Sequence, residues 1–332
     1  MVDDIKFISD TYPVQRIATG LWSLDRALGF KGDNGVPLRS LFELYGHEHS
    51  GKSTLAWFIA AKVNPKGTVW IADLEGTIEG KYVTEVMRNA GFSGTIRVAN
   101  YIEAKKGKDA LRPHEAQFQD AIDSLLEQDV SAAVIDSIGM FWPIVDVAKD
   151  LGERSMGQRA KTVADASRRV AAWLRVTEEP KLCFYINHVH PNIGGRGFDT
   201  PGGQTKKFAA NIRVWLQRIE SDIPDGSGNF LAEARVQKLK HGGANPERKG
   251  LVFFIPGFGI SKELTDVFDC IRLKLAERGA TIKLSQYDIK KGKDEFVSMG
   301  RIGDLVEKAQ EPTKHVTLFK NFADALTRYE NG

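Results

Sequence analysis

The chain has few cysteines, no long hydrophobic run and no N-terminal signal pattern, and each absence excludes a class of protein. Its 332 residues include two cysteines, Cys183 and Cys270, each beside apolar residues. A disulfide framework is therefore excluded, and we expect two buried, reduced thiols in an intracellular protein. Without an apolar run long enough to cross a bilayer, we expect a cytoplasmic protein that has no membrane segment.

Strong net charge and internal repetition are also missing. Lys and Arg number 46 against 43 Asp and Glu, which gives a formal net charge of +3. Such a balance neither requires nor excludes nucleic acid as a partner, and any basic surface must be local. The length and the 42% hydrophobic content allow one large domain and a smaller one.

Short apolar runs alternate with helical patterns along most of the chain. The runs that we expect to form buried strands are 41–45, 68–72, 132–135, 182–186 and 212–217. The helical patterns between them are 53–63, 80–90, 112–127, 158–176 and 204–210. This alternation predicts an α/β fold with a mostly parallel sheet covered by helices on both faces.

The composition changes toward the C-terminus. The turn-rich residues 221–229 predict a hairpin connection, and 230–239 and 250–255 have the pattern of antiparallel strands. Beyond about residue 260 the chain becomes more charged. We expect residues 262–332 to form a small α+β appendage with helices near 262–278 and 319–329.

Residues 46–53 spell Gly-His-Glu-His-Ser-Gly-Lys-Ser, which matches the P-loop pattern G-x-x-x-x-G-K-[ST]. An apolar strand precedes the motif and a helix follows it, as a phosphate-binding loop requires. Lys52 would reach the β- and γ-phosphates, and the Ser53 hydroxyl would ligate Mg²⁺. The residues expected to bind ATP here are Gly46, His47, Glu48, His49, Ser50, Gly51, Lys52, Ser53 and Thr54.

Three further strands end in polar residues, where α/β proteins place catalytic groups. Glu75 follows the strand at 68–72 and could activate the attacking water. Asp136 ends the strand at 132–135 and would hold Mg²⁺ together with Ser53. His188 follows the strand at 182–186, where a polar side chain can sense the γ-phosphate.

The histidines also allow a different hypothesis. His47 with His49, and His188 with His190, form two H-x-H pairs that could ligate a metal. The position of the first pair inside the phosphate loop disfavours that alternative.

This set of motifs resembles the RecA family of homologous-recombination ATPases over roughly residues 16–293. The likeness rests on 18–29, on Glu48 within the P-loop, on Asp73-Leu74-Glu75 and on Asp136-Ser137. It implies a RecA-like ATPase core at 16–261, after a short N-terminal segment at 1–15 and before a small C-terminal region at 262–332. It also implies that Glu75 is the catalytic base and that Glu79 and Tyr82 contact adenine.

Two glycine-containing stretches, at about 142–157 and 189–205, resemble the family's DNA-binding loops. Mobile loops with isolated basic residues suit a phosphate backbone, because they contact phosphates without reading bases. The residues expected to bind DNA are Arg154, Met156, Lys161, Arg168, Arg196, Gly202, Gly203, Lys206 and Lys207. Asn187-His188 resembles phage-type recombinases of the family, since many bacterial members have Gln at the second position.

The subunit contacts of the family have partial counterparts. Phe208 falls on the residue that couples neighbouring subunits, and Lys240 on a lysine that reaches ATP across the interface. The family often has a second lysine two residues later, where this chain has Gly242. The resemblance therefore implies a homo-oligomer, with a helical filament expected, and a catalytic set of Lys52, Glu75, His188 and Lys240.

The sequence thus predicts an ATP-dependent, DNA-binding recombinase with DNA-stimulated ATP hydrolysis. Assembly on single-stranded DNA, pairing with a homologous duplex and strand exchange would be its activities. The expected partners are single- and double-stranded DNA and single-strand-binding or loader proteins, with no membrane. The alternative is a RecA-like ATPase that acts as a recombination mediator or as a ring-forming DNA motor without strand exchange.

Overall fold

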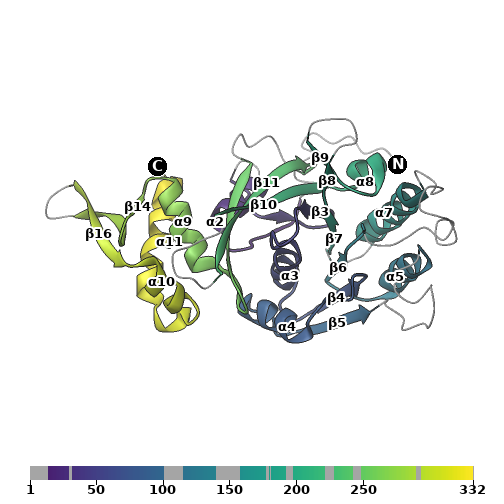
Figure 1. The fold of residues 1–332 in the computed structure, drawn as a ribbon, viewed down its shortest axis with the longest axis horizontal. Helices are drawn as coiled ribbons and strands as arrows, with labels where there is room; N and C mark the ends of the chain where they lie inside the picture. Colours follow the sequence, from purple (N-terminus) through teal and green to yellow (C-terminus); the bar gives the residue numbers. More distant parts are fainter. Residues whose placement is uncertain are drawn as a thin grey trace, which may run out of the picture.

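A nine-stranded sheet forms the centre of the molecule in the computed structural model of residues 1–332. The structure describes residues 14–29, 32–100, 115–139, 158–176, 179, 181–191, 197–220, 228–241, 248–288 and 293–331. The strand order is β13-β12-β11-β10-β3-β7-β6-β4-β5; Figure 1 labels the strands from β11 to β5. The N-terminal segment expected at 1–15 lies almost entirely outside the described residues.

Six of these strands are parallel; five of them confirm the predicted sheet, and β5 was not predicted. They are β3 (Ser40–Gly46), β4 (Thr68–Asp73), β5 (Thr95–Asn100), β6 (Ala132–Asp136), β7 (Leu182–His188) and β10 (Ile212–Glu220). The remaining three, β11 (Phe230–Leu239), β12 (Lys249–Ile255) and β13 (Gly259–Ser261), continue the sheet antiparallel to their neighbours. The antiparallel pairing of β10 with β11 confirms the predicted hairpin connection.

Helices bury both faces of the sheet. On one face, α2 (Trp22–Leu28), α3 (Lys52–Val63) and α4 (Gly80–Asn89) pack on strand residues such as Phe42 and Phe184. On the other face, α5 (Glu115–Glu127) and α7 (Gln158–Val176) pack on their neighbours Leu41 and Tyr185. Successive strand residues point to opposite faces, so a strand buried on both sides needs a continuous apolar run.

The C-terminal elements gather at one end of the molecule, drawn in yellow-green and yellow in Figure 1. They are α9 (Lys262–Arg272), β14 (Ala276–Arg278), β15 (Ile282–Asp288), β16 (Lys293–Gly300), α10 (Ile302–Ala309) and α11 (Val316–Asn331). The helix expected to reach residue 278 ends at Arg272, so that prediction is wrong. Lys274 has a φ of 61°, a left-handed conformation that does not continue a helix, and β14 follows it.

Shorter elements complete the described fold. β1 (Arg16–Ile17) pairs with β2 (Val36–Pro37), and β8 (His190–Pro191) pairs with β9 (Phe198–Asp199). The helix predicted before residue 212 is α8 (Gly203–Ala209). Both cysteines are free and buried, as predicted. Within the described ranges, we find no helix with the length and apolar character needed to span a membrane.

Candidate ATP site and DNA-binding loop

The P-loop connects the carboxyl end of β3 to the first turn of α3, and two of its glycines have no space for a side chain. A Cβ atom on Gly46 would lie 2.2 Å from the carbonyl oxygen of Leu216. Gly51 has a φ of +87°, and a Cβ there would lie 2.5 Å from the Phe254 ring. The loop backbone is thus packed against its own sheet with its amide groups at a helix N-terminus, which is the cradle that phosphates need.

Two side chains hold the P-loop in shape through one carbonyl group. The Ser50 hydroxyl and the Lys52 ammonium both donate to the His47 carbonyl oxygen, at 2.8 and 2.6 Å. Lys52 is only 5% exposed. Burial lowers the pKa of Lys52, and the nearby carboxylates of Asp136, Glu75 and Glu48 act in the opposite direction. Its ammonium therefore rests on a neutral acceptor that a phosphate oxygen can replace.

Ser53 and Asp136 lie together, as a Mg²⁺ site requires. Burial raises the pKa of Asp136 to about 7, although the Ser53 hydroxyl donates to its carboxylate. A hydroxyl and one carboxylate fit Mg²⁺, which takes few protein ligands and completes its shell with phosphate and water. Among the residues that the structure describes, no group of three or more His, Cys, Asp or Glu side chains could hold a metal. His47, His49, His188 and His190 therefore belong to no such group in the described part of the chain.

Glu75 and His188 are in direct contact, although more than a hundred residues separate them in the sequence. His188 Nε2 lies 2.9 Å from Glu75 Oε1, at the carboxyl ends of β7 and β4. The turn that carries Glu75 is fixed by Asp73, whose carboxylate accepts from the amides of Gly76 and Ile78 at 2.7 and 3.1 Å. Burial acts to raise the pKa of Glu75, but the His188 hydrogen bond and the Lys52 charge hold it below its ordinary value. Glu75 is therefore a carboxylate at neutral pH, as a base must be.

The residues expected near adenine border two adjoining pockets. A pocket of about 350 Å³ is lined by His49, Gly51, Thr54 and Tyr82, and another of about 460 Å³ by Glu79 and Tyr82. The Tyr82 hydroxyl lies 3.2 Å from Thr54 Oγ1, which links α4 to the P-loop helix. Tyr82 thus lies where a base attached to P-loop phosphates could contact it.

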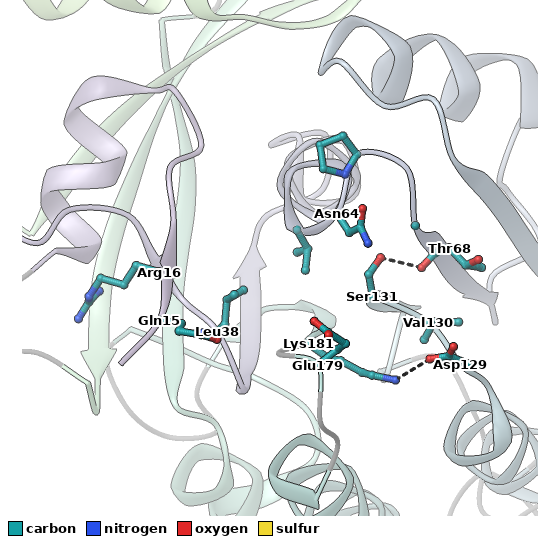
Figure 2. A pocket seen from close by; sticks show the side chains of 13 residues that line it. Gln15, Arg16, Leu38, Asn64, Thr68, Asp129, Val130, Ser131, Glu179 and Lys181 are labelled. Atoms are coloured by element: carbon teal, nitrogen blue, oxygen red, sulfur yellow. Dashed lines mark hydrogen bonds and ion pairs between the residues drawn. The ribbon is translucent and has the colours of Figure 1, made fainter. Parts of the chain in front are cut away.

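Figure 2 shows a pocket with a volume of about 640 Å³. It lies where the parallel strands begin, on the side of the sheet opposite the P-loop. Leu38, Thr68, Ser131 and Lys181 line it, and each lies at or before the amino end of a parallel strand. Ligands of open α/β sheets bind at the carboxyl ends of the strands. None of the residues expected to bind ATP lines this pocket, so it is not the nucleotide site.

The described end of the second loop packs against α7, the helix that follows the first loop. Gly202 and Gly203 have φ values of +98° and +74°, and a Cβ on Gly203 would lie 2.7 Å from that of Ala160. Lys161, next to Ala160, is exposed beside this contact. Arg168 lies about two turns further along α7 and donates to Asp165. Arg154, Met156 and Arg196 lie outside the described residues.

The expectation that Lys206 contacts DNA is wrong for this structure. Lys206 is 1% exposed, and its ammonium donates to Glu43 Oε1 at 2.5 Å and to Thr200 Oγ1 at 2.6 Å. An ammonium can be buried only with such partners, and these withdraw it from solvent. The adjacent Lys207 lies 2.6 Å from Asp199 and stays partly exposed, so it keeps access to a ligand.

Sequence reasoning missed two contacts between the ATP site and the second loop. The half-exposed ring of Phe198 meets the P-loop His47 edge-on, with 4.7 Å between ring centroids. Glu43, in the middle of β3, bonds the side chains of Asn187, Lys206 and Arg213. One charged residue inside an apolar strand is a detectable sign of such a buried cluster, although the sequence does not name its partners.

Phe208 and Lys240 are exposed on one surface, away from the P-loop of their own chain. Phe208 is 72% exposed at the end of α8, where the Lys238 ammonium donates to its carbonyl oxygen at 3.1 Å. Lys240 directly follows Leu239, which pairs with Ile212 at the start of β10. That end of β10 lies beside the amino-terminal half of β3, whereas the P-loop follows the carboxyl end of β3. Gly242 lies outside the described residues.

The fold and the site define a P-loop ATPase in which nucleotide-binding groups project from the carboxyl ends of β3, β4, β6 and β7. The model of the RecA N-terminal domain family matches residues 6–261. The chain therefore belongs to the RecA family, and it is an ATP-dependent DNA recombinase and DNA-dependent ATPase of that family. The family match does not favour the alternative of a mediator or ring-forming motor.

Curated relatives from several bacteria agree with this assignment. The chain is 28% identical over 308 residues to Protein RecA of a Nitratiruptor species, and the alignment covers 90% of this chain and 83% of that protein. It is 29% identical over 255 residues to Protein RecA of Clostridium botulinum (strain Alaska E43 / Type E3), covering 75% of this chain and 66% of the relative. Protein RecA of Solidesulfovibrio magneticus is 28% identical over 256 residues, with 75% and 66% covered. The likeness to phage-type members stays a prediction.

Proposed function

We propose that the protein binds ATP at the P-loop, assembles on single-stranded DNA and uses the second loop to link the two events. The contact between His188 and Glu75 carries this proposal. Glu75 is the group suited to activate water, and His188 begins the segment that leads into the loop. Loss of the γ-phosphate would therefore change the partners of a residue that is attached to the DNA-binding segment.

Each residue of the site has one role in this proposal. Lys52 leaves the His47 carbonyl for the phosphates, and Glu75 orients the attacking water and accepts its proton. Mg²⁺, held by Ser53 and Asp136, would neutralise charge on the phosphates. Lys240, which is exposed and distant from its own P-loop, would supply a cation to the neighbour's ATP. Phe208 would bury its exposed ring in the same interface.

Lys161, Arg168, Lys207 and the Gly202–Gly203 pair are the described residues that we propose for DNA contact. Lys161, Lys207 and the two glycines gather where the second loop returns to α7, and Arg168 lies further along that helix, which supports one continuous binding strip. Double-stranded DNA, single-strand-binding proteins and loader proteins are further proposed partners. An activity that needs both DNA and ATP supports a cytoplasmic location for the protein.

ATP hydrolysis measured with and without single-stranded DNA tests the proposed function. We expect hydrolysis to rise on DNA addition, and electron microscopy with an ATP analogue to show helical filaments on the same DNA. A hydrolysis rate that does not respond to single-stranded DNA would contradict the proposal. Rings instead of filaments would contradict the assembly that we propose.

His188→Ala should uncouple ATP from DNA. ATP should still bind, because Lys52, Ser53 and the P-loop backbone remain, but the alanine cannot pass the state of the γ-phosphate to the loop. The ratio of single-strand affinities with a non-hydrolysable ATP analogue and with ADP should fall by at least about fivefold, the low end of ordinary coupling. His190→Ala, an exposed histidine two residues along, is the matched control and should keep the ratio. An unchanged ratio in His188→Ala would remove His188 as the sensor.

A further inference from the structure

A buried ionic cluster surrounds Glu43, which lies three residues before the first P-loop residue, Gly46. We name it the Glu43 cluster; its members are Glu43, Asn187, Thr200, Lys206 and Arg213. Glu43 Oε1 accepts from Asn187 Nδ2 at 2.9 Å and from Lys206 Nζ at 2.5 Å, and Oε2 accepts from Arg213 Nε at 2.5 Å. The side chains of Glu43 and Lys206 are each 1% exposed. Removing one partner of such a pair would leave the other as an uncompensated buried charge.

The two cations of the cluster differ in how far they depend on Glu43. Arg213 is 14% exposed and also stacks over the Tyr45 ring, with 4.7 Å from its guanidinium carbon to the centroid. Among the described residues, the Lys206 ammonium donates only to Glu43 and to the Thr200 hydroxyl. Burial raises the pKa of Glu43, yet the charges of Lys206 and Arg213 outweigh this and hold it below its ordinary value. Glu43 is therefore held as a carboxylate between the two cations.

The members of the cluster come from both ends of the second loop. Asn187 directly precedes His188 at the start of the loop, whereas Thr200 and Lys206 lie at its return into α8. The Asn187 amide donates to Glu43 and also to the Pro201 carbonyl oxygen at 3.0 Å, so it bridges the two ends. One carboxylate in the strand that carries the P-loop thus holds the start and the return of the loop together.

We propose that Glu43 and Lys206 are positioning residues that clamp the base of the second loop to the P-loop strand. This inference rests on the proposed function, in which ATP changes DNA affinity through that loop. With its base clamped, a displacement that starts at His188 must appear in the loop itself. With the base released, Thr200 and Pro201 can move together with His188, and DNA affinity no longer follows the nucleotide.

Lys206→Met is the decisive variant, because it removes the charge and keeps an apolar stem of similar length. The matched control is Lys181→Met, which removes another buried lysine, 7% exposed and paired with Asp129, at the opposite edge of the sheet. For each protein, ATP affinity is measured first. Single-strand affinity is then measured with a non-hydrolysable ATP analogue and with ADP, and the ratio of the two is the readout.

We expect Lys206→Met to bind ATP like the wild type while its affinity ratio falls at least about fivefold, and Lys181→Met to keep the wild-type ratio. A wild-type ratio in folded Lys206→Met would overturn the proposal, and so would an equal fall in both variants. If Lys206→Met does not fold, Glu43→Gln with Lys206→Met removes the charges of Glu43 and Lys206 together, and a wild-type ratio in that double variant would also overturn the proposal. Absence of any nucleotide dependence in the wild type would instead contradict the proposed function.

Discussion

Glu75→Gln should leave the protein able to bind ATP and DNA while ATP hydrolysis almost stops. The introduced amide has the shape of the carboxylate but cannot accept a proton from water. Removal of a general base slows a reaction by roughly 10²- to 10⁴-fold. The measurement is a steady-state hydrolysis rate at saturating ATP and single-stranded DNA, together with ATP affinity from a separate titration.

Glu79→Gln is the matched control for this prediction. It makes the same chemical change four residues away, at an exposed position expected near adenine rather than near the γ-phosphate. We expect Glu79→Gln to alter ATP affinity at most modestly and to keep the turnover number at saturation. If Glu75→Gln turns over ATP at a rate near that of the wild type, Glu75 is not the base and another group must activate the water.

The core of the fold was predictable because its information is local. Strands buried on both faces need continuous apolar runs, and β3, β4, β6 and β7 follow such runs within about two residues. β5 was missed because it is an edge strand. Its residues Thr95–Asn100 are all exposed or only partly buried, and they carry no apolar run. Edge strands are recognisable mainly from the neighbour that they pair with, here β4.

The ATP site was predictable to the extent that its residues form a contiguous motif or end a strand. The P-loop, Glu75 and Asp136 could each be located in this way, and the fold brings them to one edge of the sheet. The contact of His188 with Glu75 was not predictable from the sequence. It depends on the order β7-β6-β4, which sets the positions of residues far apart in the chain.

Lys206 shows why a basic residue in a glycine-rich segment is a weak indicator of DNA binding. Lys206 and Lys207 are neighbours in the same helix with the same charge, yet one is 1% exposed and the other pairs with Asp199 near the surface. Adjacent residues on a helix point about 100° apart, so one faced the Glu43 carboxylate and the other did not. The charged residue within β3 was the only indication in the sequence that a buried cation was needed.

Lys52→Ala should abolish ATP binding in the concentration range at which the wild type is saturated. Lys52 is the buried cation of the P-loop, and its ammonium would form charge-assisted hydrogen bonds to the β- and γ-phosphates. Two such bonds, at roughly 1.5–3 kcal/mol each, correspond to about 10²- to 10⁴-fold in affinity. The loop should keep its shape in the variant, because the Ser50 hydroxyl still donates to the His47 carbonyl oxygen at 2.8 Å.

Lys62→Ala provides the comparison that separates loss of phosphate contact from damage to α3. Lys62 lies on the same helix, and its pKa is also lowered chiefly by burial, but it is in the last turn, about 15 Å from Lys52. For both variants, ATP affinity is measured by titration in the presence of Mg²⁺. The unfolding temperature is then measured without nucleotide and with ATP. We expect Lys62→Ala to bind ATP like the wild type, and ATP to raise the unfolding temperature of the wild type and of Lys62→Ala but not of Lys52→Ala. Micromolar ATP affinity in folded Lys52→Ala would show that the phosphates are held elsewhere.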